Sequence, residues 1–193
     1  MRPADQPYLS LVVAARYDDH GGSFMRRVQA FLNAFIEQCR RYRLPAEIVV
    51  AEWNPLPDRC GLAQALEWPV EMDWCRVRFV EVPPEIHARY AHASKIALYQ
   101  MIGKNTAIRR AHGEFVLATN IDIFFNEPLM RFFAERRLER GKMYRIDRYD
   151  SAEAFPLWAP VDEQLEYCEK NPLRINAVEG TFSLNGKGHR TWP

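Results

Sequence analysis

The sequence lacks most of the features that mark a zinc-stabilised, disulfide-bonded or membrane-spanning protein. Its four cysteines are far apart and form no Cys-x-x-Cys pair, which argues against a zinc site and a disulfide framework. No apolar run approaches the roughly 18 residues of a membrane span. Residues 1–7 lack the apolar segment of a signal peptide. These absences predict a cytoplasmic protein without a transmembrane segment.

The sequence also lacks a charge excess of either sign. Its 26 Lys and Arg residues nearly balance 25 Asp and Glu residues, which gives a formal net charge of +1. A nucleic-acid-binding domain is usually strongly basic, so we expect no nucleic-acid partner. With 193 residues, 48% of them hydrophobic and 26% charged, the chain has the composition of a globular protein and can bury a core of its own.

The first part of the chain alternates strand-like and helix-like segments. Residues 8–15 are apolar almost throughout, as expected of a strand that is covered on both faces. Ser23 is a suitable N-cap for a helix whose apolar residues recur at helical spacing through Cys39. Residues 47–52 predict a second strand. The chain therefore begins with a βαβ unit, in which the two strands are parallel.

Similar patterns predict further strands and helices downstream. The strands are expected at residues 76–82, 142–149 and 175–184. The helices are expected over residues 95–112, with Gly103 as a weak position, from Glu127 to shortly before Gly141, and over 162–170 with Asp162 as its cap. No closing element is expected after Asn185.

The chain is organised around residues 113–125, GEFVLATNIDIFF. Gly113 followed by the apolar residues 115–118 is typical of a helix end and a buried strand. If the chain continues in extended form, Asn120 and Asp122 point the same way. At the carboxyl end of a strand in an open α/β sheet, such a pair faces the ligand crevice, and its oxygens suit Mg²⁺ or Mn²⁺. The alternative is that the pair only forms a turn.

Together these segments resemble the family-two-like glycosyltransferases with the GT-A nucleotide-sugar fold. The most specific similarity is at residues 103–122, where a Gly-Lys-Asn segment, an Ile-x-x-Ala-x-Gly-Glu helix end and the following strand agree with the family in order and spacing. The resemblance implies an α/β fold of GT-A type, a three-layer α/β/α sandwich with a mostly parallel central sheet. Residues 1–150 would form the nucleotide-sugar-binding core. Residues 151–193 would be a short acceptor-side segment of the same domain, either minimal or incomplete.

The resemblance assigns donor-binding roles to four matching positions. Glu52 would accept hydrogen bonds from the base, expected to be uracil; the alternative is an ordinary surface acid after a strand. Ala15 and Arg16 would line the nucleotide cleft, with Arg16 available to a phosphate as a bidentate donor, or else lying in solvent. Asn105 would lie near the nucleoside, or would only cap or bend its helix at Gly103.

The resemblance also implies a metal ligand and a general base. Asp122 would hold Mg²⁺ or Mn²⁺ against the diphosphate. Asn120 replaces the first Asp of the family's motif, so the ion would bind less tightly, or Asn120 would contact the ribose. The family's base is an acid in a later segment. Its best match is Glu179, in residues 179–184, where Thr181 stands in place of the family's Asp. The alternative is that Glu179 is an exposed loop acid.

The resemblance therefore implies an inverting, metal-dependent glycosyltransferase, which moves a sugar from a nucleoside-diphosphate donor, expected to be a UDP-sugar, to an acceptor hydroxyl. The competing hypothesis is a GT-A-like nucleotide-binding module without turnover, favoured by Asn120 and by the short segment that follows Glu179. A nucleotidyltransferase is disfavoured, because the loop at residues 15–22 has two acids and one arginine instead of a glycine-rich basic sequence. The sequence identifies neither the donor sugar, the acceptor nor the oligomeric state.

Overall fold

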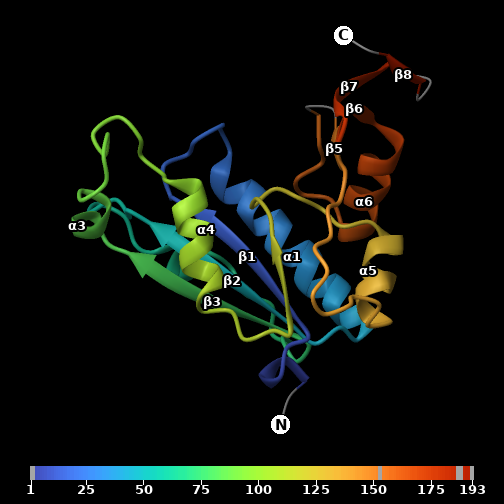
Figure 1. Cartoon of the computed structure of the whole chain (residues 1–193), viewed down its shortest axis with the longest axis horizontal. Helices are drawn as coiled ribbons and strands as arrows, with labels where there is room; N and C mark the ends of the chain where they lie inside the picture. Colours follow the sequence, from blue (N-terminus) through green and yellow to red (C-terminus); the bar gives the residue numbers. More distant parts are fainter. Residues whose placement is uncertain (1–2, 152–153, 186–188, 192–193) are drawn as a thin grey trace. The chain divides into compact units, whose positions relative to one another are not determined.

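The computed structural model describes residues 3–151, 154–185 and 189–191, and the chain divides into two compact units, Met1–Leu138 and Glu139–Pro193 (Figure 1). The first unit contains a sheet of four parallel strands, and the second a sheet of four antiparallel strands. Within the described part of the chain, no helix is long and apolar enough to cross a membrane.

The parallel sheet of the first unit has the strand order β3-β2-β1-β4. In this sheet, β1 (Leu9–Ala15) lies between β2 (Ala46–Trp53) and β4 (Phe115–Ala118), and β3 (Cys75–Val82) pairs with the far side of β2. Every residue of β1 and β2 is buried, which explains why both sequences are mostly apolar on both faces. The predicted strands and the opening βαβ unit are confirmed. The first unit is thus an α/β domain, consistent with a Rossmann-like fold.

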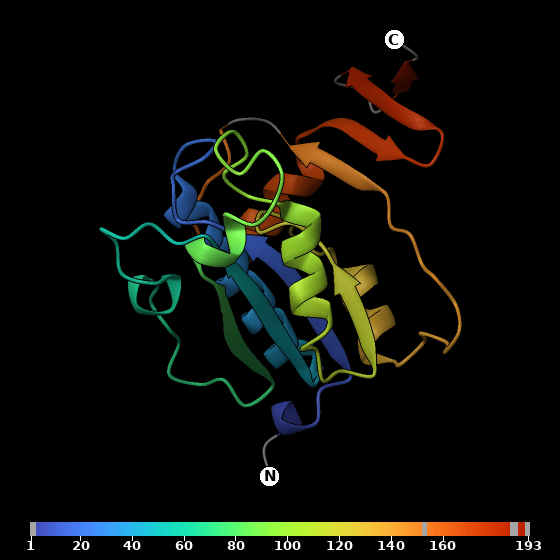
Figure 2. The same ribbon diagram turned by 60° about the vertical axis from the view of Figure 1, so that its left-hand side comes forward.

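Helices cover both faces of this sheet (Figures 1 and 2). On one face, α1 (Phe24–Tyr42) and α5 (Glu127–Ala134) pack with the sheet around buried residues such as Phe31. On the other face, α4 (Gln100–Ile108) packs through Ala107 against β1 and β2. The first unit therefore has three layers, with the sheet in the middle. Short helices complete its connections: η1 (Pro3–Asp5), α2 (Leu62–Ala65) and α3 (Pro84–His87).

Helix α4 is shorter than the predicted 95–112, and the role predicted for Gly103 is wrong. Gly103 is buried against β1, where an added Cβ would lie 2.8 Å from the Cβ of Ala14. Only a glycine lets the helix approach the sheet this closely. Gly103 is therefore a packing position, at which α4 lies nearest to the strand.

The predicted N-cap of α1 is also wrong. Ser23 precedes the helix with a left-handed backbone (φ 49°) and makes no side-chain cap. Asp19 takes this role, since its Oδ1 accepts a hydrogen bond from the amide of Phe24 at 2.9 Å. Gly21 and Gly22 both have positive φ angles, which turn the loop so that Asp19 reaches the helix start.

The second unit is built on an antiparallel sheet with the order β5-β6-β7-β8. Its strands are β5 (Arg148–Ser151), β6 (Pro172–Ala177), β7 (Gly180–Asn185) and β8 (His189–Thr191), and α6 (Val161–Lys170) lies between β5 and β6 in sequence. Ile175, Ala177 and Phe182 form the buried apolar cluster of the β6–β7 hairpin.

Several predictions for this part of the chain are wrong. Residues 142–147 alternate in sequence but are exposed throughout, so the alternation marks no buried face and β5 begins only at Arg148. The single strand predicted at 175–184 is a hairpin, and β8 follows it. Helix α6 is confirmed, but Asp162 lies in its first turn, after the N-cap. In the first unit, helix α5 also ends earlier than expected, at Ala134.

Candidate functional site

Most of the predicted site residues lie at one edge of the parallel sheet. Ala15 and Glu52 are direct partners in the register of β1 and β2, at the carboxyl ends of both strands. Arg16 follows Ala15. Asn120 and Asp122 follow β4, whose last residue pairs with the middle of β1. Carboxyl ends of parallel strands are where open α/β sheets bind their ligands, so the structure brings these five residues to the expected edge.

The backbone does not stay extended after β4, because Ile121 and Asp122 form a turn. The side chains of Asn120 and Asp122 nevertheless have polar partners from two helices. Asn120 Oδ1 accepts hydrogen bonds from Lys104 Nζ at 2.8 Å and from Gln100 Nε2 at 3.2 Å. Asp122 Oδ2 lies 3.2 Å from Nη1 of Arg27. The turn and a ligand site are therefore compatible.

Lys104 and Arg27 come from helices on opposite faces of the sheet. Lys104, in α4, is partly buried, and this burial lowers the pKa of its ammonium while the charge of Asp122 opposes the shift. Arg27, in α1, is fixed by loop carbonyls: Nε donates to Gly22 at 3.0 Å and Nη2 donates to His20 at 2.5 Å. Two cations therefore converge on the segment that follows β4.

Arg16 is not a loop arginine in solvent. Its Nε donates to the carbonyl oxygen of Asn54 at 2.9 Å, and its Nη1 lies 2.6 Å from Oδ2 of Asp18. The guanidinium therefore ties the loop after β1 to the end of β2. These contacts use part of its donor set and leave its role toward a phosphate as a prediction. Ala15 is buried beside it.

Glu52 is buried, with 4% of its surface exposed, so it is not an ordinary surface acid. Its Oε1 accepts a hydrogen bond from the amide of Leu62 at 2.9 Å, at the start of α2. Burial raises the pKa of the carboxyl above its usual value; the Leu62 amide opposes this and the charge of Glu81 adds to it. This carboxyl therefore holds α2 at the end of β2, and its contact with a base stays a prediction.

Two predicted residues are not part of this group. Asn105 is exposed on α4, two positions from both Gly103 and Ala107, which face the sheet. Its side chain therefore lies on the face of α4 that is turned away from the sheet. Glu179 belongs to the second unit, where it lies exposed in the turn between β6 and β7.

An aromatic cluster lies where β2 ends, on the α4 face. Trp53 is buried and its Nε1 donates to Nδ1 of His87 at 2.8 Å, while His87 Nε2 lies 3.0 Å from the carbonyl oxygen of Ala93. The rings of Tyr90 and Tyr99 lie 5.7 and 5.9 Å from that of Trp53 and are partly exposed. The tryptophan and histidine anchor the loop, and the two tyrosines give this end of the sheet an aromatic surface.

Lys104, Arg27 and Gln100 are not among the residues predicted from the sequence. Gln100 and Lys104 are four residues apart on one helix, a spacing that places them on the same face, and this signal could have been used. Arg27 carries no such signal, because its partner Asp122 is 95 residues away.

The donor set at this edge is a poor one for a divalent ion. Among the described residues, no group of three or more His, Cys, Asp or Glu side chains could hold a metal. After β4, the side-chain oxygen of Asn120 and the carboxylate of Asp122 each already face a cation. Mg²⁺ normally takes one or two carboxylates with phosphate oxygens, and here Lys104 and Arg27 would repel it.

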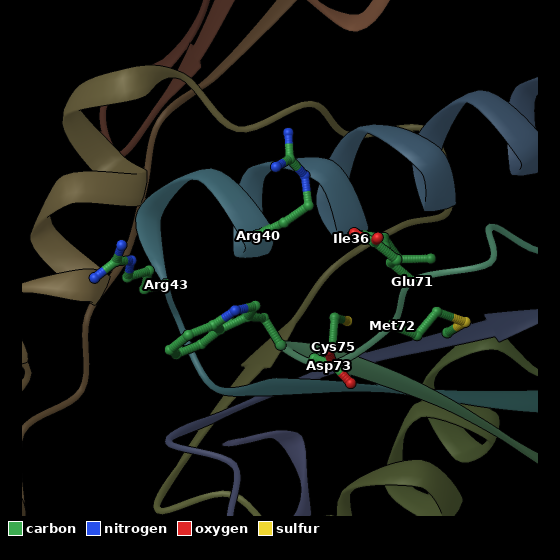
Figure 3. A pocket seen from close by; sticks show the side chains of 8 residues that line it. Ile36, Arg40, Arg43, Glu71, Met72, Asp73 and Cys75 are labelled. Atoms are coloured by element: carbon green, nitrogen blue, oxygen red, sulfur yellow. The ribbon is translucent and has the colours of Figure 1, made fainter. Parts of the chain in front are cut away.

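A separate pocket of about 270 Å³ lies at the opposite end of the sheet (Figure 3). It is lined by the end of α1, including Arg40 and Arg43, and by residues 71–75 at the start of β3. Strands of this sheet begin there, so the pocket is not the crevice at the carboxyl ends.

No protein-family model matches the chain, and neither the curated proteins nor the solved structures include a significant match. The fold therefore defines the protein as an α/β protein with an all-parallel sheet in its first unit. Its candidate site is the polar edge of that sheet, on which two cations converge.

Proposed function

We propose that the chain is a glycosyltransferase of GT-A type, which moves a sugar from a nucleoside-diphosphate donor, with UDP as the expected nucleotide, to an acceptor hydroxyl with inversion. One observation carries the proposal. In the order β3-β2-β1-β4, the direction of strand addition reverses between β1 and β4. Open α/β sheets bind ligands at such a switch point, and Arg16 and Asn120 follow these two strands.

The chemistry of this edge supports an anionic, nucleotide-like donor. Lys104 and Arg27 supply positive charge where a diphosphate would gain negative charge as it leaves. Tyr90 and Tyr99 supply rings beside the end of β2. The polar edge and the aromatic surface suit two of the three chemical parts of a nucleotide, its phosphates and its base.

Glu179 is the proposed general base, because the resemblance assigns this role to an acid in its segment and deprotonation of an acceptor hydroxyl requires a positioned carboxylate. Three acids near this edge already have partners: Asp18 pairs with Arg16, Asp122 with Arg27, and Asp19 accepts the Phe24 amide. Glu179→Gln should lower transfer by about 100-fold or more, the usual effect of removing a general base, and should leave nucleotide binding unchanged.

The second candidate is a nucleotide-binding module without turnover. The observation that favours it is that these three acids near the edge already have hydrogen-bond or ion-pair partners. In a module of this kind, Glu179→Gln would change nothing. A donor-hydrolysis assay of the unaltered chain separates the two candidates, because only the enzyme releases free sugar.

Calorimetric titration of the full chain with UDP and with GDP tests the proposal that both candidates share. We expect one of the two nucleotides to bind and the other to bind weakly. If neither binds to protein whose circular dichroism shows it to be folded, the proposed function is wrong.

A further inference from the structure

We propose that two side-chain cations, Lys104 and Arg27, hold the diphosphate of the donor in place of a divalent metal ion. The inference rests on the proposed function, because it concerns the same ligand at the same edge. It differs from the expectation of a metal-dependent transferase, which rests on the resemblance in sequence. The contacts of three residues carry it.

The first is Lys104, whose ammonium is partly buried and bonded to an amide oxygen at 2.8 Å. A buried charge is costly unless an opposite charge accompanies it. Asn120 supplies only a dipole, so this contact orients the ammonium without neutralising it. The nearby carboxylate of Asp122 is paired with Arg27, so a phosphate oxygen would supply the negative charge that directly accompanies the ammonium.

The second is Arg27, whose guanidinium is held before any ligand arrives. The carbonyl oxygens of Gly22 and His20 fix Nε and Nη2, and Nη1 is directed at Asp122. The side chain of Asp122 is 44% exposed, so this ion pair is screened by water and weak. A phosphate, which matches the guanidinium geometry and carries more charge, can therefore compete with Asp122 for Nη1.

The third is Asn120, which is a positioning residue in this arrangement. With an aspartate at this position, Lys104 would form a salt bridge, and two adjacent carboxylates would attract a divalent ion instead of a phosphate. The amide keeps the hydrogen bond to Lys104 and removes the competing charge. The change from Asp-x-Asp to Asn-x-Asp thus accompanies a change in the group that neutralises the diphosphate.

The first test is calorimetric titration of the full chain with UDP, in excess EDTA and in Mn²⁺. We expect similar dissociation constants in both. Lys104→Gln, which can still bond Asn120, should weaken UDP by about 10- to 100-fold in EDTA, as expected for one charge-assisted hydrogen bond, and leave uridine unaffected. Arg109→Ala is the matched control, because it removes one exposed cation from the end of the same helix and should leave UDP binding unchanged.

A second variant keeps the test decisive if Lys104→Gln fails to fold. Asn120→Asp should weaken UDP in EDTA and make its binding depend on Mn²⁺. UDP binding that requires Mn²⁺ in the unaltered chain overturns this inference and leaves the proposed function standing. Equal effects of Lys104→Gln and Arg109→Ala also overturn it. If neither UDP nor GDP binds the folded chain in either solution, the proposed function itself is wrong.

Discussion

At the start of β2, the carboxylate of Glu47 is enclosed by hydrogen-bond donors, whereas at the other edge of the same sheet the carboxylate of Asp122 is nearly half exposed. Glu47 accepts from Ser10 Oγ at 2.7 Å, Arg78 Nε at 2.9 Å and the His112 amide at 2.5 Å. Asp122 has one long contact with a cation. Similar side chains therefore form a closed structural network at the amino edge and an open site at the carboxyl edge.

The difference lies in how many donors each acid has relative to its burial. Burial alone raises the pKa of Glu47, but hydrogen bonds from Arg78, Ser10 and the His112 amide outweigh it and lower that pKa below its usual value. At the carboxyl edge, the charged group that is partly buried is the Lys104 ammonium, and its hydrogen-bond acceptor is the neutral amide of Asn120. Burial therefore lowers the pKa of Lys104, and only the charge of Asp122 opposes this shift. A satisfied network stabilises the fold, and an unsatisfied one has capacity left for a ligand.

The largest effect should come from opening the closed network. Glu47→Ala leaves Arg78 without its carboxylate and Ser10 without its acceptor, so the free energy of unfolding should fall by about 3–5 kcal/mol. Urea unfolding followed by circular dichroism measures this. Glu127→Ala is the control, because it breaks an exposed pair with Arg131 and should cost less than about 1 kcal/mol. Equal losses in both variants would remove the contrast between the two edges.

A smaller effect is expected from adding one carbon beside this network. Gly113 donates its amide to Ser10 Oγ at 2.8 Å, and a Cβ on it would lie 2.6 Å from the backbone nitrogen of Ser10. Gly113→Ala should therefore cost roughly 1–3 kcal/mol through overpacking. In Gly22→Ala the added carbon meets open space, and only the left-handed backbone opposes it, at about 1–2 kcal/mol. A Gly113 variant as stable as the wild type would show that the network is not tightly packed.

The pH dependence of stability should reflect the same acid. Because the pKa of Glu47 is lower in the folded than in the unfolded chain, its contribution is present above the unfolded value, about 4.3, and is lost as the pH falls through the folded value. Glu37, whose pKa is lowered to about 2 mainly by Arg40, acts in the same direction. Urea unfolding between neutral and acid pH should show a shallower decline for Glu47→Gln than for the unaltered chain, and parallel curves would contradict this.

The smallest effect on stability should come from the open edge. Asp122→Asn removes an exposed ion pair with Arg27 and should change the free energy of unfolding by less than about 1 kcal/mol. The same urea experiment tests it. A loss as large as that of Glu47→Ala would mean that the carboxyl edge is a structural network too.

The sequence predicted the parallel strands well because β1 and β2 are buried on both faces, and this burial leaves a direct mark on composition. It also placed Asn120 and Asp122 at the carboxyl edge of the sheet, where the structure has them, since topology alone carries residues after β4 to that edge. It failed where exposure matters: residues 142–147 alternate without a buried face.

The partners of the site residues could not be predicted for a different reason. Whether Lys104 and Arg27 reach Asn120 and Asp122 depends on how α4 and α1 are rotated about their axes on the two faces of the sheet. That rotation follows from packing, such as the contact of Gly103 with Ala14, and local sequence patterns do not encode it.

The close approach of Gly103 to β1 fixes the position of α4 on the sheet. The helix nearly touches β1 at this glycine, and the neighbouring residue is the lysine that reaches Asn120. Any side chain at position 103 would lift the helix from the strand and draw the ammonium away from the amide oxygen. The position of the Lys104 ammonium therefore depends on a neighbouring residue that has no side chain, and a substitution at position 103 would shift this cation without altering any polar group of the edge.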